Sequence, residues 1–317
     1  MAVIGLDLGG TKLSGAIFDQ NGTILFKNSS PLNKKAGSEV GVLIINLLDG
    51  LLSVSTEKGI EIKSIGVCIP GIYWAKTGSV WAPNIKGWEN YPLLEELTSH
   101  LTDKNISVCI DSDRACYVLG EVWQGSAKEC KDVIFMAVGT GIGAGILING
   151  EVLRGANDIA GAIGWLALER PYKEKFIQCG CYEYYASGDG LARSAEEIIN
   201  SSPGYAGEFK SLSSITSYDV FKGYKNNDEV AIKVISQGIE LWGMAAANLV
   251  SLFNPEKIVF GGGVFGPASE LVEDIYKEAK KWAQPISITK VKFEKSQLGS
   301  DAGLIGAGYL ALKKIIS

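Results

Sequence analysis

Two segments of this 317-residue chain repeat one pattern of apolar runs and glycine turns, and this repeat restricts the possible folds more than any other feature. In residues 3–26 and again in 133–154, an apolar run leads through a glycine turn to a second run, an Asn-Gly pair and a third run. Asn-Gly between apolar runs is the strongest short-range signal for a hairpin. Two similar domains could each open with a three-stranded meander, or a glycine-rich chain could hold two meanders by chance. The matched register of both turns favours the repeat.

The rest of the chain alternates helix-like and strand-like segments. Apolar residues at helical spacing predict helices, and apolar runs predict strands. The predicted helices are 40–52, 92–101, 114–122, 186–199, 230–253, 271–282 and 302–316, and the predicted strands are 65–69, 106–110 and 257–260. The fold class is therefore α/β. We expect a small α/β domain over 1–113, onto which the C-terminal helix 302–317 crosses back, and a large α/β domain over 114–301.

Composition excludes several classes of protein. Hydrophobic residues make up 46% of the chain, which is enough to build each core without disulfides, and six cysteines fit a reducing compartment. A formal charge of -5, without any Lys/Arg cluster longer than a pair, argues against a nucleic-acid surface. The N-terminus lacks the basic region of a signal peptide, and apolar stretches such as 135–148 are shorter than the ~20 residues of a membrane span. We expect a cytoplasmic protein that binds neither nucleic acid nor membrane.

The glycine turns of the repeat are candidate phosphate sites. The P-loop pattern is absent, and residues 139–144 fit a relaxed dinucleotide fingerprint but lead into a β-run where that fingerprint requires a helix. What remains is a pair of turns whose amides and Thr hydroxyls, those of Thr11 and Thr140, can bind phosphate oxygens. Two such turns in register within a repeat favour phosphate binding over plain tight turns.

Three aspartates follow predicted strands at positions suited to phosphoryl transfer. This reaction needs a metal held by a carboxylate, directly or through water, and a base near the acceptor hydroxyl. Asp7 ends the first strand beside Gly9 and Gly10 and suits the metal role. Asp111 and Asp113 follow the strand-like run and open a helix. We expect one of them to cap that helix and the other to be free for catalysis.

A series of motifs occurs in order along nearly the whole chain. They are Asp7-Leu8-Gly9-Gly10-Thr11-Lys12, Ile69-Pro70-Gly71, Ala82-Pro83-Asn84, Asp113 with Leu119-Gly120-Glu121, Gly139-Thr140-Gly141-Ile142-Gly143, Gly180-Cys181-Tyr182-Glu183, Gly261-Gly262-Gly263 and Asp301-Ala302-Gly303-Leu304. This combination resembles the ROK family of bacterial sugar kinases and repressors. The resemblance implies a two-domain actin/hexokinase-like fold of ribonuclease H-like repeats with an inter-domain cleft. It also implies ATP-dependent phosphorylation of a hexose or hexose derivative.

The resemblance further implies roles for individual residues. Asp113 would be the general base that takes the proton of the sugar hydroxyl. Asp7, which its position already suits to the metal role, is expected to hold magnesium through water. ATP would contact the two turns and the third glycine cluster, through Gly9, Gly10, Thr11, Lys12, Thr140, Gly141, Gly262 and Gly263. The sugar would contact Gly71, Asn84, Ser112 and Glu183. The family also implies a homodimer.

The chain departs from the family pattern around the expected sugar and zinc sites. Where the family has Gly-Glu-Ile-Gly-His, residues 161–165 read Gly-Ala-Ile-Gly-Trp, so a sugar-binding Glu and a His that binds sugar and zinc are both replaced. Cys179 and Cys181 alone are too few for a tetrahedral site, and we expect no zinc. Trp165 either stacks on the sugar or fills the space of the lost loop. The alternative function is a sugar- or nucleotide-binding sensor without turnover, and the identity of the sugar stays open.

Overall fold

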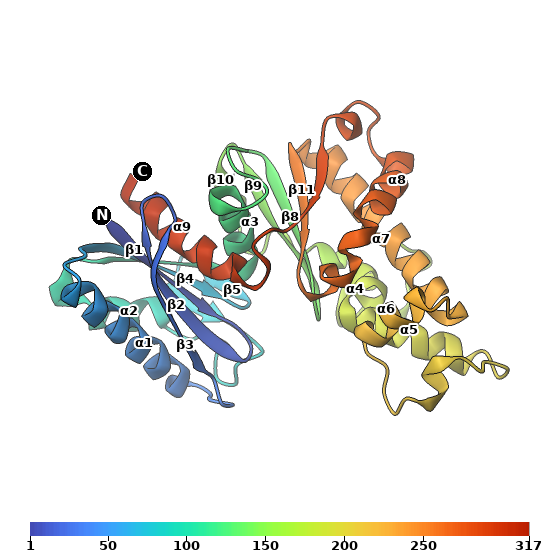
Figure 1. Ribbon diagram of the computed structural model, residues 1–317, viewed down its shortest axis with the longest axis horizontal. Helices are drawn as coiled ribbons and strands as arrows, with labels where there is room; N and C mark the ends of the chain where they lie inside the picture. The colour runs from blue at the N-terminus through green and yellow to red at the C-terminus, as the bar shows by residue number, and fades with distance from the viewer. Residues whose placement is uncertain (317) are drawn as a thin grey trace. The chain divides into compact units, whose positions relative to one another are not determined.

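The computed structural model describes residues 1–316, apart from the side chain of Asp103, as two compact units. The first unit comprises Met1–Glu129, Val152–Ala160 and the residues from Gln297 onward; the second comprises Cys130–Glu151 and Gly161–Ser296. Each unit is built around a five-stranded sheet covered by helices (Figure 1). The mixed α/β fold class is thereby confirmed. The division falls at 129/130, where the sequence led us to expect 113/114, and the segment 152–160 returns to the first unit.

The first sheet brings three strand ends to one edge. Its strand order is β3-β2-β1-β4-β7. The first three strands form the predicted antiparallel meander, and β4 and β7 continue the sheet parallel to β1. Asp7, Cys68 and Asp111 are register neighbours near the carboxyl ends of β1, β4 and β7. The strand bounds are β1 (Ala2–Leu8), β2 (Lys12–Asp19), β3 (Ile24–Pro31), β4 (Ile62–Ile69) and β7 (Ser107–Ser112), with a separate hairpin of β5 (Ile72–Trp74) and β6 (Ser79–Trp81).

Helices pack on both faces of this sheet. Ile4 of β1 lies in one core with residues of α1 (Ser38–Glu57) and α2 (Leu93–His100), whereas its neighbour Val3 packs with residues of α9 (Ala302–Ile316). The helix α3 (Asp113–Gln124) packs along α9. The backbone of α9 approaches β4 so closely that a Cβ on Gly66 would lie 1.9 Å from the Ala307 carbonyl oxygen. The C-terminal helix is thus an integral part of the first unit, and α3 belongs there with it.

One helix exceeds the apolar length expected from the sequence. α1 is long and apolar enough to cross a membrane by length and composition alone. In the structure, its residues Val40, Ile44, Leu48 and Leu51 are buried in the core of the first unit. A buried core helix of this composition meets the same criterion, and α1 is packed as a core helix in this structure.

The second sheet repeats the first. Its strand order is β10-β9-β8-β11-β12, in which β8 and β9 pair antiparallel and β11 lies parallel to β8 and β12. The strands are β8 (Val133–Val138), β9 (Ile142–Ile148), β10 (Glu151–Val152), β11 (Lys257–Gly261) and β12 (Lys292–Lys295). The helices are α4 (Gly180–Ala186), α5 (Gly188–Asn200), α6 (Ser217–Lys225), α7 (Glu229–Phe253) and α8 (Val272–Trp282). The predicted helix over 186–199 therefore begins at Gly188, because Ser187 interrupts it and caps α5 through the amide of Gly190.

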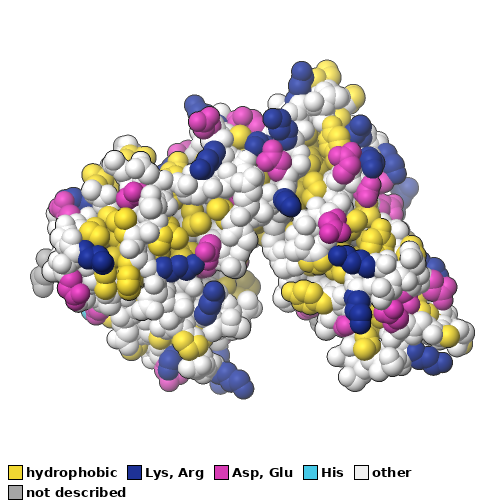
Figure 2. Space-filling view, in the orientation of Figure 1, with side chains coloured by type: hydrophobic (Ala, Val, Ile, Leu, Met, Phe, Trp, Pro, Cys, Tyr) yellow, Lys and Arg dark blue, Asp and Glu magenta, His cyan; other side chains and the backbone are white. Residues whose placement is uncertain are grey.

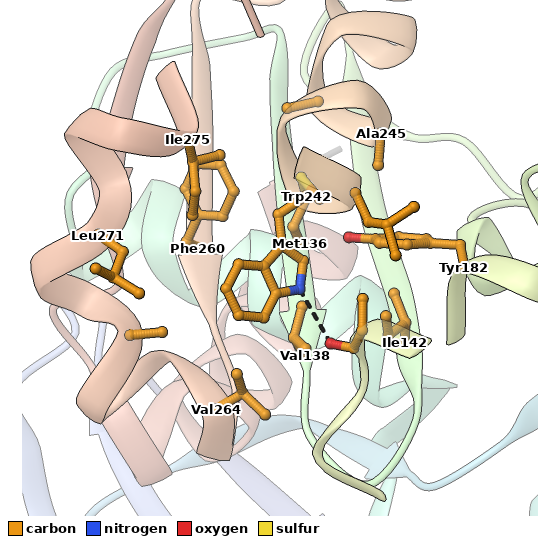
Figure 3. Close-up of a cluster of buried hydrophobic side chains, with 14 of the residues drawn as sticks. Met136, Val138, Ile142, Tyr182, Trp242, Ala245, Phe260, Val264, Leu271 and Ile275 are labelled. Atoms are coloured by element: carbon orange, nitrogen blue, oxygen red, sulfur yellow. Dashed lines mark hydrogen bonds between the residues drawn. The ribbon is translucent and has the colours of Figure 1, made fainter. Parts of the chain in front are cut away.

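The core of the second unit fixes the junction between α4 and α5. Trp242 of α7 is fully buried among side chains from the sheet, including Met136, Val138 and Phe260 (Figure 3). Its indole N–H donates a hydrogen bond to the carbonyl oxygen of Ala186, 3.0 Å away. A buried indole N–H needs such a partner, so the bond ties the end of α4 to α7.

Candidate active site

Two carboxylates of the first unit lie at the edge where β1 and β7 end. Asp113 is the first residue of α3, and burial raises its pKa to about 6, an effect to which the charge of Asp7 adds and which Arg114 opposes. Burial also raises the pKa of Asp7, whose carboxylate accepts a hydrogen bond from the thiol of Cys68. A carboxylate with a pKa near neutrality suits general-base catalysis.

The cap of α3 corrects one prediction. Neither Asp111 nor Asp113 caps the helix; Ser112 does, through a 3.3 Å hydrogen bond that its Oγ accepts from the amide of Ala115. Ser, Asp and Asn are near-equal as caps, so a run of Asp-Ser-Asp offers three competitors and the strand end decides among them. Asp111 is instead buried, and Arg154 donates hydrogen bonds to its Oδ2 from Nε, at 3.0 Å, and from a terminal nitrogen. The sequence carried no signal for Arg154.

The first glycine turn is open to solvent. The amide of Gly9 donates to the carbonyl oxygen of Lys12 at 3.0 Å, which closes the turn, and Leu32 of the neighbouring chain segment donates to the carbonyl oxygen of Thr11 at 2.9 Å. Gly10, Thr11 and Lys12 are exposed, and a Cβ on Gly10 would have no neighbour within 4 Å. A phosphate could therefore approach these backbone amides directly.

The predicted sugar residues of the first unit lie on adjoining loops. Gly71 has a φ of 110°, and a Cβ there would lie 2.2 Å from the carbonyl oxygen of Trp81, so glycine allows the two loops to touch. Asn84 follows the second of these loops and is exposed. The structure thus groups Gly71 with Asn84, and groups Ser112 with Asp113 at the β7–α3 junction.

Glu183 hydrogen-bonds the second glycine turn. The Oε2 of Glu183, on α4, accepts a 2.6 Å hydrogen bond from the amide of Ile142, and a Cβ on Gly141 would come within 2.9 Å of the same oxygen. The amide of Gly188, the first residue of α5, donates to the carbonyl oxygen of Gly139 at 2.7 Å. Burial raises the pKa of Glu183, and the amide of Ile142 opposes this. Glu183 of α4 and Gly188 of α5 therefore both hydrogen-bond the turn that carries Thr140.

A cavity of about 340 Å³ opens beside this turn within the second unit. Gly262 has a φ of 89°, and a Cβ there would lie 2.4 Å from the carbonyl oxygen of Val138, whereas Gly263 faces open space. Glycine at 262 allows its backbone to approach β8 closely, and glycine at 263 leaves the cavity accessible. Its lining comprises Gly139, Thr140, Gly188, Asp189, Ala192, Ile215, Thr216, Ser217, Tyr218, Gly263 and Val264. Apolar walls with a few polar groups are typical of a small-molecule site.

Trp165 and the two cysteines lie around the start of α4. The side chain of Trp165 is 57% exposed, so it does not fill a buried space. Cys181 is buried, and its Sγ accepts from the amide of Leu168 at 3.2 Å and donates to the carbonyl oxygen of Leu166 at 3.1 Å. Among the described residues, no group of three or more His, Cys, Asp and Glu side chains could hold a metal ion. The absence of zinc stays a prediction.

The charges on the visible surface are mixed. On the face drawn in Figure 2, Lys and Arg side chains alternate with Asp and Glu side chains across both units. A nucleic-acid surface needs a concentrated positive field, and this face does not provide one.

The fold and these two sets of residues define a class of α/β proteins that includes sugar-phosphorylating enzymes. The structure resembles that of a ROK hexokinase from Thermus thermophilus, with a TM-score of 0.83 and 27% identity over 100% of this chain and 99% of the other. It also resembles a ROK family glucokinase from Streptomyces griseus in complex with glucose and AMPPNP, with a TM-score of 0.74 and 27% identity over 99% and 100% of the chains.

The family itself follows from the sequence comparisons. The ROK family model matches residues 3–314, so the chain belongs to the ROK family. A glucokinase of Halalkalibacterium halodurans is 33% identical over 97% of this chain and 94% of its own length. The resemblance drawn from the motifs is thereby confirmed.

Proposed function

We propose that this protein transfers the γ-phosphoryl group of ATP to a hydroxyl of a hexose or hexose derivative, with Asp113 as the general base. The observation that carries the proposal is the carboxyl group of Asp113, at the strand edge beside Asp7, with a pKa raised to about 6. Such a group is ionised at neutral pH yet basic enough to accept the proton of a sugar hydroxyl as the oxygen attacks.

The glycine turns are proposed to hold the nucleotide. The exposed amides at Gly10 and Thr11 and the charge of Lys12 suit phosphate oxygens, and Thr140 and Gly141 offer the same groups in the second unit. The cavity beside Gly263 suits the adenosine moiety. The ROK family glucokinase structure with bound AMPPNP supports the use of ATP.

Asp7 is proposed to hold magnesium through water. The residues fit this role because the half-buried carboxylate of Asp7 has a weak thiol donor, Cys68, as a hydrogen-bond partner and offers the oxygen ligands that magnesium prefers. When bound, magnesium neutralises the charge on the β- and γ-phosphate oxygens. Homodimerisation stays a prediction from the family, and a cytoplasmic location stays a prediction from the composition.

The sugar is proposed to contact Gly71, Asn84, Ser112 and Glu183, with Trp165 near it. An exposed aromatic ring is available to stack on the apolar face of a pyranose, whereas the second possibility, a space-filling role, is less consistent with its exposure. The relatives that phosphorylate glucose support a hexose, and the substitutions at 162 and 165 leave its identity open.

A coupled assay of ADP release over a panel of hexoses and N-acetylated hexoses tests the function. Turnover with at least one sugar, abolished in Asp113→Asn, is the expected result. Tight sugar binding without turnover of any sugar would instead establish the non-catalytic sensor.

A further inference from the structure

We propose that Arg154 is a positioning residue for phosphoryl transfer, acting through Asp111 on the β7–α3 junction that carries Asp113. Arg154 lies in the segment Val152–Ala160, which follows the second meander and packs within the first unit. Its guanidinium donates from two nitrogens to Oδ2 of Asp111, with Nε at 3.0 Å. The kinetic part of this inference rests on the proposed function.

The two side chains of the Arg154–Asp111 pair differ in their exposure to solvent. The side chain of Asp111 is 6% exposed, and that of Arg154 is 39% exposed. Burial raises the pKa of Asp111, and the charge of Arg154 is the first of the effects that oppose it. Removing the guanidinium would leave a buried carboxylate without its counter-charge, which is costly unless the group takes up a proton or moves. The Arg154 guanidinium therefore stabilises both the ionised form of the Asp111 carboxyl group and its position.

Asp111 also hydrogen-bonds the β7–α3 junction, which carries Asp113. While Oδ2 faces Arg154, Oδ1 accepts a 2.8 Å hydrogen bond from the amide of Ser112. Ser112 caps α3, and Asp113, the next residue, accepts a 2.8 Å hydrogen bond at Oδ1 from the amide of Arg114. Two bonds thus link the guanidinium to the backbone beside the proposed base. A base displaced by even a fraction of an ångström from its acceptor hydroxyl loses catalytic efficiency.

The 152–160 segment is attached to the first unit at a second point. The Oδ2 of Asp158 accepts a 3.0 Å hydrogen bond from the amide of Ala75, which follows β5 in the loop that begins near Gly71. The amide of Ala160 donates to the carbonyl oxygen of Arg154 at 3.1 Å and closes the segment into a loop. These two bonds restrain the backbone of the segment, and Asp111 restrains the Arg154 guanidinium. This arrangement favours a fixed position for Arg154 over a mobile surface charge.

The test compares Arg154→Gln, Arg154→Lys and Asp111→Asn with the wild type. Steady-state kinetics on the sugar that the wild type phosphorylates should show kcat lowered ~10- to 100-fold in Arg154→Gln, with the KM for ATP unchanged. Arg154→Lys keeps the positive charge but cannot donate from two nitrogens, and its kcat should lie between those of Arg154→Gln and the wild type. Because both residues act in one chain of contacts, the Arg154→Gln/Asp111→Asn double variant should lose no more than the worse single variant.

The matched control is His100→Gln. His100 also hydrogen-bonds an aspartate of the first unit, Asp49, at 2.8 Å, but it lies in a groove with Ile62 and Ile106, at the ends of β4 and β7 opposite to Asp113. This variant should retain wild-type kcat. A comparable loss in His100→Gln would show that any lost polar pair of this unit impairs turnover, and would overturn the specific role of Arg154.

Hydrogen exchange separates this inference from the proposed function. In Arg154→Gln, peptides covering 107–117 should exchange faster than in the wild type, while peptides of α7 should not change. Unchanged exchange at 107–117 overturns the positioning role, whether or not the wild type phosphorylates a sugar. Faster exchange in a protein without any turnover would support the anchoring and refute the kinase. Faster exchange with unaltered kcat would refute the catalytic consequence of the anchoring.

Discussion

At the scale of single residues, burial gives three neighbouring aspartates different properties. Asp111 is buried against a guanidinium, Asp7 is half-buried beside a thiol, and Asp113 has a pKa raised to about 6. The same side chain can thus serve as a structural anion, a metal-facing anion or a base, according to its partner. The motif pattern was sufficient to single out Asp113 and Asp7. It could not find the partner of Asp111, because Arg154 is 43 positions away and lies in a segment without a recognisable motif.

Asp113→Asn should remove turnover and preserve sugar binding. The amide keeps the size of the carboxyl group but cannot accept the proton, and loss of a general base costs ~100- to 10,000-fold in kcat. Single-turnover kinetics and titration calorimetry with the sugar measure the two quantities separately. A variant that keeps more than a tenth of the wild-type rate would assign the base to another residue.

Turnover should rise with pH through about 6 and be lost below it. Asp113 acts as a base only when ionised, and its raised pKa sets the midpoint of this acid limb. The same shift lowers the free energy of unfolding at neutral pH by about 3 kcal/mol, because the folded protein holds the ionised form less well than the unfolded chain does. Asp113→Asn should therefore melt at a higher temperature than the wild type at pH 7. An acid limb that persists in the residual activity of this variant would contradict the assignment.

At the scale of elements, Glu183 links the glycine turn of the second unit to α4. The family resemblance gives this residue a sugar contact, whereas the structure shows its carboxylate on the amide of Ile142. The sequence predicted the turn and the helix separately. Their contact depends on tertiary packing, in which Trp242 fixes the end of α4, and no local pattern reports it.

Glu183→Ala should raise the KM for ATP about tenfold or more, because it removes the support of the turn that carries Thr140. Glu183→Gln retains an oxygen acceptor for the amide of Ile142 and should be much milder towards ATP. The measurement is the KM for each substrate in both variants. A change confined to the KM for the sugar, equal in Gln and Ala, would show that sugar contact is the sole role of Glu183.

The loop before α4 is predicted to be stable without zinc. Cys181 satisfies the backbone of Leu166 and Leu168, and the ammonium group of Lys175 lies over the rings of Tyr184 and Tyr185, 4.6 and 4.9 Å from their centroids. Purified protein should contain no stoichiometric zinc, and a chelator should leave its melting temperature unchanged. Cys181→Ala should cost about 1–2 kcal/mol, because it leaves these backbone groups without a partner. One zinc per chain would refute the prediction.

At the scale of the whole molecule, the residues proposed for binding and catalysis come from both units. Asp7, Thr11, Asn84, Ser112 and Asp113 belong to the first unit, whereas Thr140, Glu183 and Gly263 belong to the second. The repeat in the sequence anticipated two similar sheets, each with a glycine turn. It did not anticipate that residues 152–160 return to the first unit. There Arg154 pairs with Asp111 and Asp158 accepts a hydrogen bond from Ala75, contacts between residues far apart in the sequence that no local pattern reports.

A substrate that contacts residues of both units should draw them together. We predict that a saturating sugar substrate reduces the radius of gyration in small-angle scattering, and that Asp113→Asn, which binds sugar without turning it over, shows the same change. Closure would exclude water that otherwise competes for the phosphoryl group. The control is a hexose that calorimetry shows not to bind, which should leave the scattering curve unaltered. If the true substrate binds without any change in the scattering curve or in paired crystal structures, the site is preformed and the proposed closure is wrong.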